Sequence, residues 1–320
     1  MILVTGATGF VGKALVQRLL ADDESRRLVV AVRIDGQPWP ERVIPIVTGN
    51  LKPSADWSIA LEGVAVVVHS AARVHVMHDT EAEPLTAFRA VNVDGTLNLA
   101  RQAAAAGVKR FVFISSVKVN GESTPNGRAF TEVDAPAPQD AYGQSKHETE
   151  QGLRQLAVET GMDVVIIRPP LVYGPGVKAN FAALMRAVQR GWPLPLGAVH
   201  NQRSLVALDN LVDFIVTCIT HPQAANQTFL VSDGHDLSTT DLVRGMAQAV
   251  GVPARLLPVP EWALQAGASL LGRRDMAQRL CGSLQVDISK TQELLGWKPP
   301  VSVDESLAKM ARHFLASQSQ

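Results

Sequence analysis

The sequence predicts an α/β protein built around a doubly wound parallel sheet, with a second, smaller α/β domain. Three observations support this prediction. Short apolar runs alternate with amphipathic stretches through the first half, a glycine-rich turn follows the first apolar run, and Pro- and Gly-rich loops replace this regular pattern after Arg168. Strands that alternate with helices are typical of βαβ units, whose strands lie parallel in one sheet.

The apolar runs give the expected strands in order. These are Ile2–Thr5, Leu28–Arg33, Val43–Val47, Val64–His69, Arg110–Ser115 and Asp163–Arg168. Amphipathic helices are expected between them at Val11–Ala21, Pro84–Ala106 and Tyr142–Thr160. Further along, the pattern predicts a helix at Leu208–Thr220 and a strand returning to the sheet at Gln227–Val231. Two more helices are expected to begin after the capping residues of Ser238–Asp241 and Val303–Asp304.

The change of texture after Arg168 marks the expected domain boundary. The first domain is predicted to contain residues 1–169 and about 205–232, as a Rossmann-type domain. The second is predicted to contain about 170–204 and 233–320.

The composition indicates an ordinary soluble globular protein. Hydrophobic residues make up 46% of the 320 residues, and 30 Lys and Arg balance 30 Asp and Glu. Because there is no net basic field, we expect no nucleic-acid partner. Without a secretory pattern after Met1 or an apolar run of membrane-spanning length, we expect a cytoplasmic protein with no membrane span. Cys218 and Cys281 are expected to be buried thiols.

Three glycines mark a predicted dinucleotide site. Gly6, Gly9 and Gly12 follow the first expected strand and open the first helix. Such glycines permit a tight turn and let a pyrophosphate approach the helix N-terminus, where N–H groups are free. The strand-turn-helix context predicts a nucleotide cofactor.

The end of the second strand bears on the choice of cofactor. NAD sites usually place an acidic residue there to bind the ribose hydroxyls, whereas this strand ends at Arg33. A guanidinium pairs well with the 2′-phosphate of NADP. We therefore expect NADP. The alternative is NAD, with Arg33 facing solvent and Asp35 serving the ribose.

Tyr142 and Lys146 lie four residues apart on one predicted helix, on the same face. Chance is a modest competitor for such a spacing, so its context matters. Here the pair precedes a strand and follows a glycine-rich nucleotide site, which favours a catalytic phenol and ammonium.

Five motifs follow one another along the chain: Gly6/Gly9/Gly12, His69–Ala72, Asn92–Thr96, Ser115–Ser116 and Tyr142/Lys146. In this order the chain resembles the extended short-chain dehydrogenases, the NAD-dependent epimerase/dehydratase family, over nearly its whole length. The resemblance implies that Tyr142 acts as general acid or base, while Ser116 binds the same substrate oxygen and Lys146 holds the nicotinamide ribose. Lys146 and an oxidised nicotinamide are expected to stabilise the Tyr142 phenolate.

The resemblance also implies a set of residues that bind the cofactor. They come from the glycine turn, the ends of the strands and the catalytic helix. They are Gly6, Thr8, Gly9, Phe10, Val11, Arg33, Asn50, Leu51, Ser70, Ala71, Ala72, Asn92, Tyr142, Lys146 and Pro169. Asn50 stands where relatives often have an Asp that contacts adenine, and an amide can still serve that edge.

The substrate residues implied by the resemblance are Asn180 and Arg203 at a diphosphate, Leu196 near uracil, and Arg279 as a second diphosphate candidate. Lys118 departs from the family pattern. It is expected either to be a solvated loop charge or to contact the sugar or its pyrophosphate. The spacing of His75, His78 and Asp79 is compatible with a metal, but further ligands are missing and we expect none.

Within the family, Arg73–Met77 and Ser115–Glu122 most resemble ketoreductases of bacterial O-antigen synthesis. This resemblance implies NADPH-dependent reduction of the C4 ketone of a UDP-4-keto-6-deoxy-N-acetylhexosamine, giving a UDP-QuiNAc or UDP-FucNAc type sugar. The alternatives are a UDP-hexose 4-epimerase, acting on UDP-glucose or UDP-GlcNAc with retained NAD, and a non-catalytic NADP sensor. A dehydratase is disfavoured because no carboxylate stands beside Ser116. Relatives also lead us to expect a homodimer.

Overall fold

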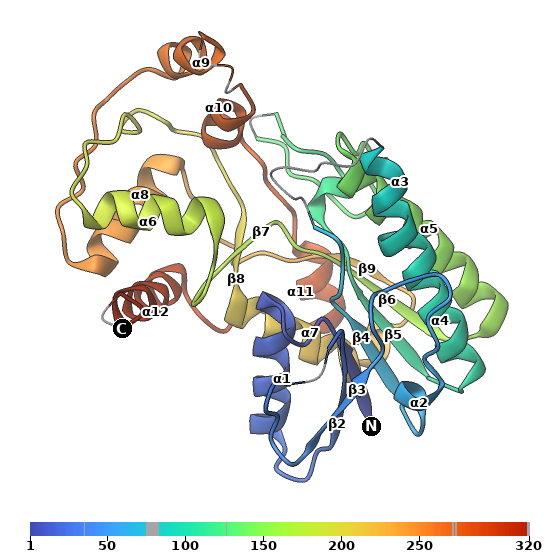
Figure 1. Ribbon diagram of the computed structural model, residues 1–320. Helices are drawn as coiled ribbons and strands as arrows, with labels where there is room; N and C mark the ends of the chain where they lie inside the picture. The colour runs from blue at the N-terminus through green and yellow to red at the C-terminus, as the bar shows by residue number, and fades with distance from the viewer. Residues whose placement is uncertain (35, 75–82, 126, 271, 273, 319–320) are drawn as a thin grey trace.

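The computed structural model describes residues 1–34, 36–74, 83–125, 127–270, 272 and 274–318, without the side chains of 179–180 and 274–277. Its centre is a seven-stranded sheet in the order β3-β2-β1-β4-β5-β6-β9, in which every pair of neighbours is parallel (Figure 1). The strands are β1 (Ile2–Thr5), β2 (Leu28–Val32), β3 (Val43–Val47), β4 (Val66–His69), β5 (Arg110–Ile114), β6 (Asp163–Arg168) and β9 (Thr228–Leu230). This confirms the predicted Rossmann-type α/β fold.

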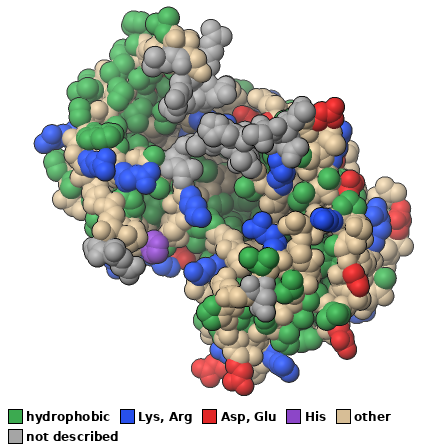
Figure 2. All heavy atoms as spheres, viewed as in Figure 1, with side chains coloured by type: hydrophobic (Ala, Val, Ile, Leu, Met, Phe, Trp, Pro, Cys, Tyr) green, Lys and Arg blue, Asp and Glu red, His purple; other side chains and the backbone are tan. Residues whose placement is uncertain are grey.

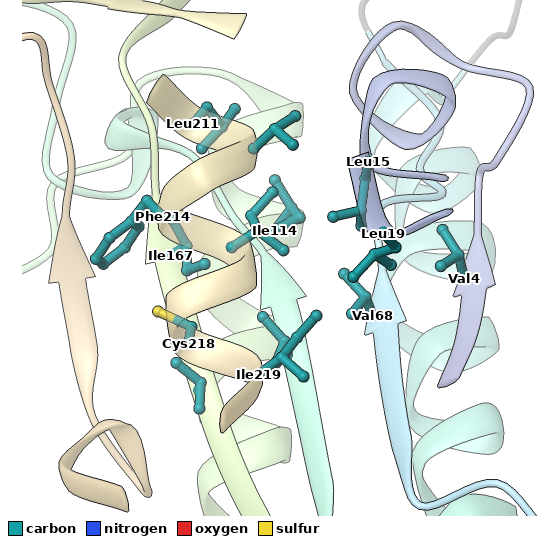
Figure 3. Packing of buried hydrophobic residues seen from close by; sticks show 14 of the residues in the cluster. Val4, Leu15, Leu19, Val68, Ile114, Ile167, Leu211, Phe214, Cys218 and Ile219 are labelled. Atoms are coloured by element: carbon teal, nitrogen blue, oxygen red, sulfur yellow. The ribbon is translucent and has the colours of Figure 1, made fainter. Parts of the chain in front are cut away.

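The strands form a sheet that is buried on both faces, because they consist almost entirely of apolar residues. All five residues of β2 and of β5 are buried. On one face lie α1 (Phe10–Asp22) and α7 (Leu208–Thr220), whose side chains pack onto the strands in Figure 3. The other face is covered by α2 (Ser58–Leu61), α4 (Thr96–Ala105) and α5 (Ala141–Thr160).

The predicted helix over Pro84–Ala106 is interrupted. It consists of α3 (Pro84–Phe88), a π-helical segment η1 (Arg89–Gly95) and α4. A π-helical turn is wider than an α-helical one and often occurs at functional sites. Here the wide turn contains the buried side chain of Asn92. The prediction gave the extent of the helix but not this irregularity.

A third hydrophobic cluster lies outside the sheet. It is formed largely by α6 (Ala179–Gln189), α8 (Thr239–Val250) and α12 (Val303–Ala316), whereas α9 (Glu261–Leu270), α10 (Arg274–Cys281) and α11 (Ser289–Leu295) complete this part of the chain. Ser238 caps α8, and Ser302 with Glu305 forms a capping box at α12. The sequence analysis missed α2, α6 and α9–α11.

A small two-stranded sheet joins the two parts. Strand β7 (Leu171–Tyr173) pairs in parallel with β8 (Leu205–Ala207), so one strand comes from each side of the predicted domain boundary. The separate third cluster supports the predicted division, which stays a prediction. We call residues 1–169 and 205–232 the sheet half and the remaining residues the outer half.

The expectation for the two cysteines is confirmed. Cys218 and Cys281 are free thiols and both are buried. In the described parts of the chain, no helix is both long and apolar enough to cross a bilayer.

Candidate active site

The candidate site lies where the strand order reverses, at the carboxyl ends of β1, β4 and β5. The chain leaves β1 and β4 in opposite directions across the sheet, which is the usual position of a ligand crevice in such folds. The predicted glycine turn, the His69–Ala72 segment and Ser116 all follow these three strands. The topology therefore gathers motifs that are far apart in the sequence.

The glycine turn between β1 and α1 has the shape that a pyrophosphate requires. A Cβ atom on Gly12 would lie 2.2 Å from the Gly6 carbonyl oxygen, so only glycine fits there. Gly9 is the N-cap of α1, and no side chain caps the helix. The free N–H groups of this first turn are therefore available to an anion. Thr8 is exposed beside them, while Phe10 and Val11 are partly buried.

The segment after β4 is held by buried hydrogen bonds. His69 lies between two hydroxyl groups, with Nδ1 2.7 Å from Thr5 Oγ1 and Nε2 2.9 Å from Thr96 Oγ1. Burial lowers the pKa of His69 to about 3, so the ring is neutral at pH 7. The Ser70 hydroxyl donates to the Thr5 carbonyl at 2.7 Å, and the Ala71 N–H donates to Thr5 Oγ1 at 3.3 Å. These hydrogen bonds hold the segment from His69 to Ala71 in place beside the glycine turn.

The residues expected near adenosine lie at the surface. Arg33 is exposed directly after β2, and Asn50 is exposed in the loop after β3. Leu51, next to Asn50, is partly buried. Asp35, the alternative ribose ligand, lies outside the described residues, as do His75, His78 and Asp79.

Asn92 connects two walls of the site. Its side chain accepts from the Arg73 N–H at 2.8 Å and donates to the Arg73 carbonyl at 3.0 Å. It also donates to the Ser145 hydroxyl of α5 at 3.0 Å. Asn92 therefore ties the segment after Ala72 to the helix that contains Tyr142.

The phenol and the ammonium of the predicted pair lie on one face of α5. Lys146 Nζ is 5.8 Å from the centroid of the Tyr142 ring and donates to the Ile114 carbonyl at 2.8 Å. Burial lowers the pKa of Lys146 to about 7, although the Glu150 carboxylate opposes this change. Burial raises the pKa of Tyr142 well above its ordinary value, and Asp140 adds to the rise. In the protein alone, Tyr142 is therefore a protonated phenol, and the phenolate expected beside an oxidised nicotinamide stays a prediction.

Lys118 pairs with carboxylates of the protein itself, and its contact with the sugar or its pyrophosphate stays a prediction. Its ammonium donates to Glu122 Oε1 at 2.8 Å and to Asp140 Oδ2. The ammonium is not a loop charge surrounded by solvent alone, because both carboxylates are close and the three side chains are 24–30% exposed. The backbone N–H of Lys118 donates to the Ser116 hydroxyl at 3.2 Å.

A buried ion pair that the sequence analysis missed lies behind the catalytic residues. Glu150 accepts from Arg168 Nε at 2.9 Å and from Arg168 Nη2 at 2.6 Å, and from the Ser115 hydroxyl at 2.6 Å. Arg168 Nη1 donates to Asn120 at 3.0 Å. Burial would raise the pKa of Glu150, but the bonds from Arg168 and Ser115 hold it below its ordinary value. This network joins β5, β6, α5 and the loop after Ser116.

The predicted substrate residues of the outer half divide into two groups. Arg203 is partly buried and donates to the Gly282 carbonyl at 2.9 Å, and Arg279 of α10 is exposed. Burial and the neighbouring Arg279 lower the pKa of Arg203, and among the described side chains no carboxylate pairs with either guanidinium. Leu196 is only 6% exposed and packs in the third cluster, so its contact with uracil stays a prediction. The side chain of Asn180 lies outside the described set.

The surface between the two halves is hollowed. Figure 2 shows Lys and Arg side chains beside this hollow. Pro169 directly follows β6, and its carbonyl accepts from the Val117 N–H at 3.0 Å. Among the described residues, no group of three His, Cys, Asp or Glu side chains is placed to hold a metal ion.

A family model described as "NAD dependent epimerase/dehydratase family" matches residues 2–232. The chain belongs to the NAD-dependent epimerase/dehydratase family. The match covers the whole seven-stranded sheet, including β9, and it ends where the sheet half ends.

Individual members of this epimerase/dehydratase family resemble the chain over its full length. A UDP-glucose 4-epimerase of Vibrio cholerae is 52% identical over 320 residues, which are 100% of this chain and 97% of the relative. A UDP-glucuronic acid 4-epimerase of Bacillus cereus, solved with NAD, matches with a TM-score of 0.79 and 21% identity over 99% of both chains. A UDP-glucose 4-epimerase of Thermotoga maritima, solved with UDP-glucose, has a TM-score of 0.77 and 22% identity over 99% of both chains.

Proposed function

We propose that this chain is a UDP-hexose 4-epimerase that retains NAD through its catalytic cycle. The observation that carries the proposal is the 52% identity, over essentially the whole of both chains, to the UDP-glucose 4-epimerase of Vibrio cholerae. The sequence analysis placed this activity second, behind a 4-ketoreductase. That order rested on the resemblance of Arg73–Met77 and Ser115–Glu122 to ketoreductases and on Arg33, and the 52% relative favours the epimerase instead.

The site residues suit a reaction at one carbinol carbon. Bound NAD would supply the oxidant that takes a hydride from C4 and the reductant that returns it to the opposite face. Tyr142 is protonated in the protein alone, so it would first lose its proton to solvent when the positive charge of a bound oxidised nicotinamide stabilises the phenolate. The phenolate would take the proton of the C4 hydroxyl and later return it, with Ser116 donating a hydrogen bond to the same oxygen. Lys146, whose pKa is about 7, would favour the phenolate while its own amine is protonated.

The cofactor follows from the same comparison. The open first turn of α1 and the glycine turn fit a dinucleotide pyrophosphate. NAD is the cofactor in the Bacillus cereus neighbour. We therefore propose NAD as the cofactor of this chain. The alternative, a preference for NADP, was inferred from Arg33 and is tested below by replacing that exposed side chain.

The substrate proposal rests on Arg203 and Arg279. Two neighbouring guanidiniums attract a dianionic group, and a diphosphate of a UDP-sugar has that charge. Rotation of a keto-sugar between hydride transfers is compatible with holding the substrate through its diphosphate. The site therefore favours a UDP-hexose.

Freshly purified protein distinguishes the candidate functions. We expect stoichiometric NAD after denaturation, and interconversion of UDP-glucose and UDP-galactose, or of the N-acetylated pair, without added cofactor. Steady NADPH consumption with a UDP-4-keto-6-deoxy-N-acetylhexosamine and no epimerisation would replace the proposal by the ketoreductase. Tight NADP binding without turnover of either substrate class would identify a sensor.

A homodimer in which the helices from Pro84 and from Ala141 pair between subunits is proposed as well. Sedimentation equilibrium tests it. A monomer at micromolar concentration contradicts this part of the proposal and leaves the epimerase activity untouched.

A further inference from the structure

The loop after Ser116 packs against the first turn of α5 through the backbone of Lys118. A Cβ atom on Gly143 would lie 2.9 Å from the Lys118 carbonyl oxygen, so the two segments meet without an intervening side chain. On the other side, the Lys118 N–H donates to the Ser116 hydroxyl at 3.2 Å. Lys118 therefore lies between Ser116 and the helix that contains Tyr142.

The side chain of Lys118 strengthens the same contact. Asp140 is the N-cap of α5, and its Oδ1 accepts from the Gly143 N–H at 2.6 Å. Its other oxygen accepts from the Lys118 ammonium, which also donates to Glu122 at 2.8 Å. Burial would lower the pKa of Lys118, but the hydrogen bonds to Asp140 and Glu122 raise it above its ordinary value. The ammonium is therefore charged at every pH at which the enzyme would work.

The charge of Asp140, which pairs with Lys118, also affects the pKa of Tyr142. Asp140 raises the pKa of Tyr142, whereas the Lys118 ammonium partly neutralises that carboxylate. Among the described residues, Lys146 on the same helix and Arg73, which lies over the Phe88 ring that packs on Tyr142, are further charged groups near the phenol. Removal of the Lys118 charge would leave Asp140 and Glu122 without their common partner.

We propose that Lys118 is a positioning residue, which joins Asp140 and Glu122 and so fixes the first turn of α5, with Tyr142, against Ser116. The role in turnover rests on the proposed epimerase function, whereas the structural part does not. Lys118 touches the Ser116 hydroxyl only through its backbone, so its side chain acts on the reaction through Asp140 and α5.

Four variants test the proposal by kinetics. Lys118→Met should lower kcat about tenfold, a change of the size expected for a lost charged hydrogen bond, while KM changes less than about twofold. The pH at which kcat/KM rises should increase by about half a pH unit, because the Asp140 carboxylate raises the pKa of Tyr142 further once the Lys118 charge is removed. Lys118→Arg should restore most of kcat. Combining Lys118→Met with Asp140→Asn should bring the pH at which kcat/KM rises back to its wild-type value, because Asn keeps the N-cap of α5 without the negative charge.

The matched control is Lys309→Met, which breaks a surface pair with Asp209 at a distance from the site and should leave all parameters unchanged. A large rise in KM with unchanged kcat in Lys118→Met would instead identify Lys118 as a sugar ligand. An unchanged kcat and pH profile would overturn the proposal outright.

Hydrogen exchange of the peptide covering residues 140–147 tests the structural part without any substrate. We expect the amides of the first turn of α5 to exchange about tenfold faster in Lys118→Met than in wild type, and at the wild-type rate in Lys309→Met. Equal rates in wild type and Lys118→Met would overturn the proposed contact. If no nucleotide sugar is epimerised, the function fails, but this exchange result still decides the role of Lys118.

Discussion

The sheet half and the outer half contribute differently to the candidate site. In the sheet half, charged groups near the site are neutralised within the protein: Glu150 pairs with Arg168, and Lys118 with Asp140 and Glu122. In the outer half, Arg203 and Arg279 lie close enough to repel each other. We propose that the first arrangement holds the reacting groups in place and that the second binds an anion of the substrate. We therefore expect changes in the sheet half to affect turnover or stability, and changes in the outer half to affect substrate binding.

The largest effect is expected from Tyr142→Phe. Loss of a positioned acid or base lowers turnover about 10²- to 10⁴-fold. The variant loses the hydroxyl group but keeps the ring against Phe88. The cofactor content and the unfolding transition should therefore stay as in wild type. Epimerisation of UDP-sugar by the variant at more than a tenth of the normal rate would remove Tyr142 from the mechanism.

Glu150→Gln should be the most destabilising single change. It leaves Arg168, whose side chain is 2% exposed, without its ionic partner, and breaking one side of a buried pair typically costs about 3–5 kcal/mol of unfolding free energy. Urea denaturation measures this. Asp209→Asn, at an exposed pair, is the control and should cost less than about 1 kcal/mol. Similar losses in the two variants would contradict the contrast between buried and exposed pairs.

Arg203→Met should weaken substrate binding rather than chemistry. Loss of a charged hydrogen bond to a diphosphate costs about 1.5–3 kcal/mol, so KM for the UDP-sugar should rise about 10- to 100-fold with kcat nearly unchanged. The Kd of UDP, measured by calorimetry, should rise in parallel. A variant that loses kcat but keeps its affinity for UDP would move Arg203 from the binding side of the comparison to the catalytic side.

The buried Lys146 gives the sheet half a dependence of stability on pH. Its pKa is about 7 in the folded protein and near 10.5 in the unfolded chain, which therefore binds more protons between these values. Stability should rise with pH over this window by about 1 kcal/mol per pH unit relative to Lys146→Met. Urea unfolding at pH 7, 8 and 9 measures the difference. Parallel curves for the two proteins would show that Lys146 does not titrate there.

The smallest effect is expected from Arg33→Ala, because this side chain is exposed. Affinity for NADP should fall about threefold to tenfold, in line with a solvent-exposed charge contact, while affinity for NAD changes little. Fluorescence titration of cofactor-free protein with both nucleotides gives the two constants. An equal change for both would mean that Arg33 does not contact the 2′-phosphate.

The sheet half was largely predictable from the sequence because each of its strands is a local apolar run. Strands β1, β3 and β6 match their predicted bounds. The outer half was not, because α9 buries none of its residues and therefore shows no clear apolar face. The small strands β7 and β8, one from each half, were also missed, because three residues are too few for a periodicity.

Within the site, motifs were predictable and partners were not. Tyr142 and Lys146 form a local pattern, whereas Lys118 and Asp140 are 22 residues apart and Glu150 and Arg168 are 18 apart. One signal was available: Asp140 precedes the helix as a typical N-cap residue. Nothing in the sequence indicates that its second oxygen binds an ammonium.

The position of β9 has a consequence for how the chain folds during synthesis. Strand β9 and helix α7 complete the sheet, although both follow the first segment of the outer half in the sequence. Until they leave the ribosome, β6 has an unpaired edge, and Val4, Leu15 and their neighbours lack the helix that covers them. The nucleotide-binding sheet should therefore acquire its native stability only after Leu230 has emerged, late in translation.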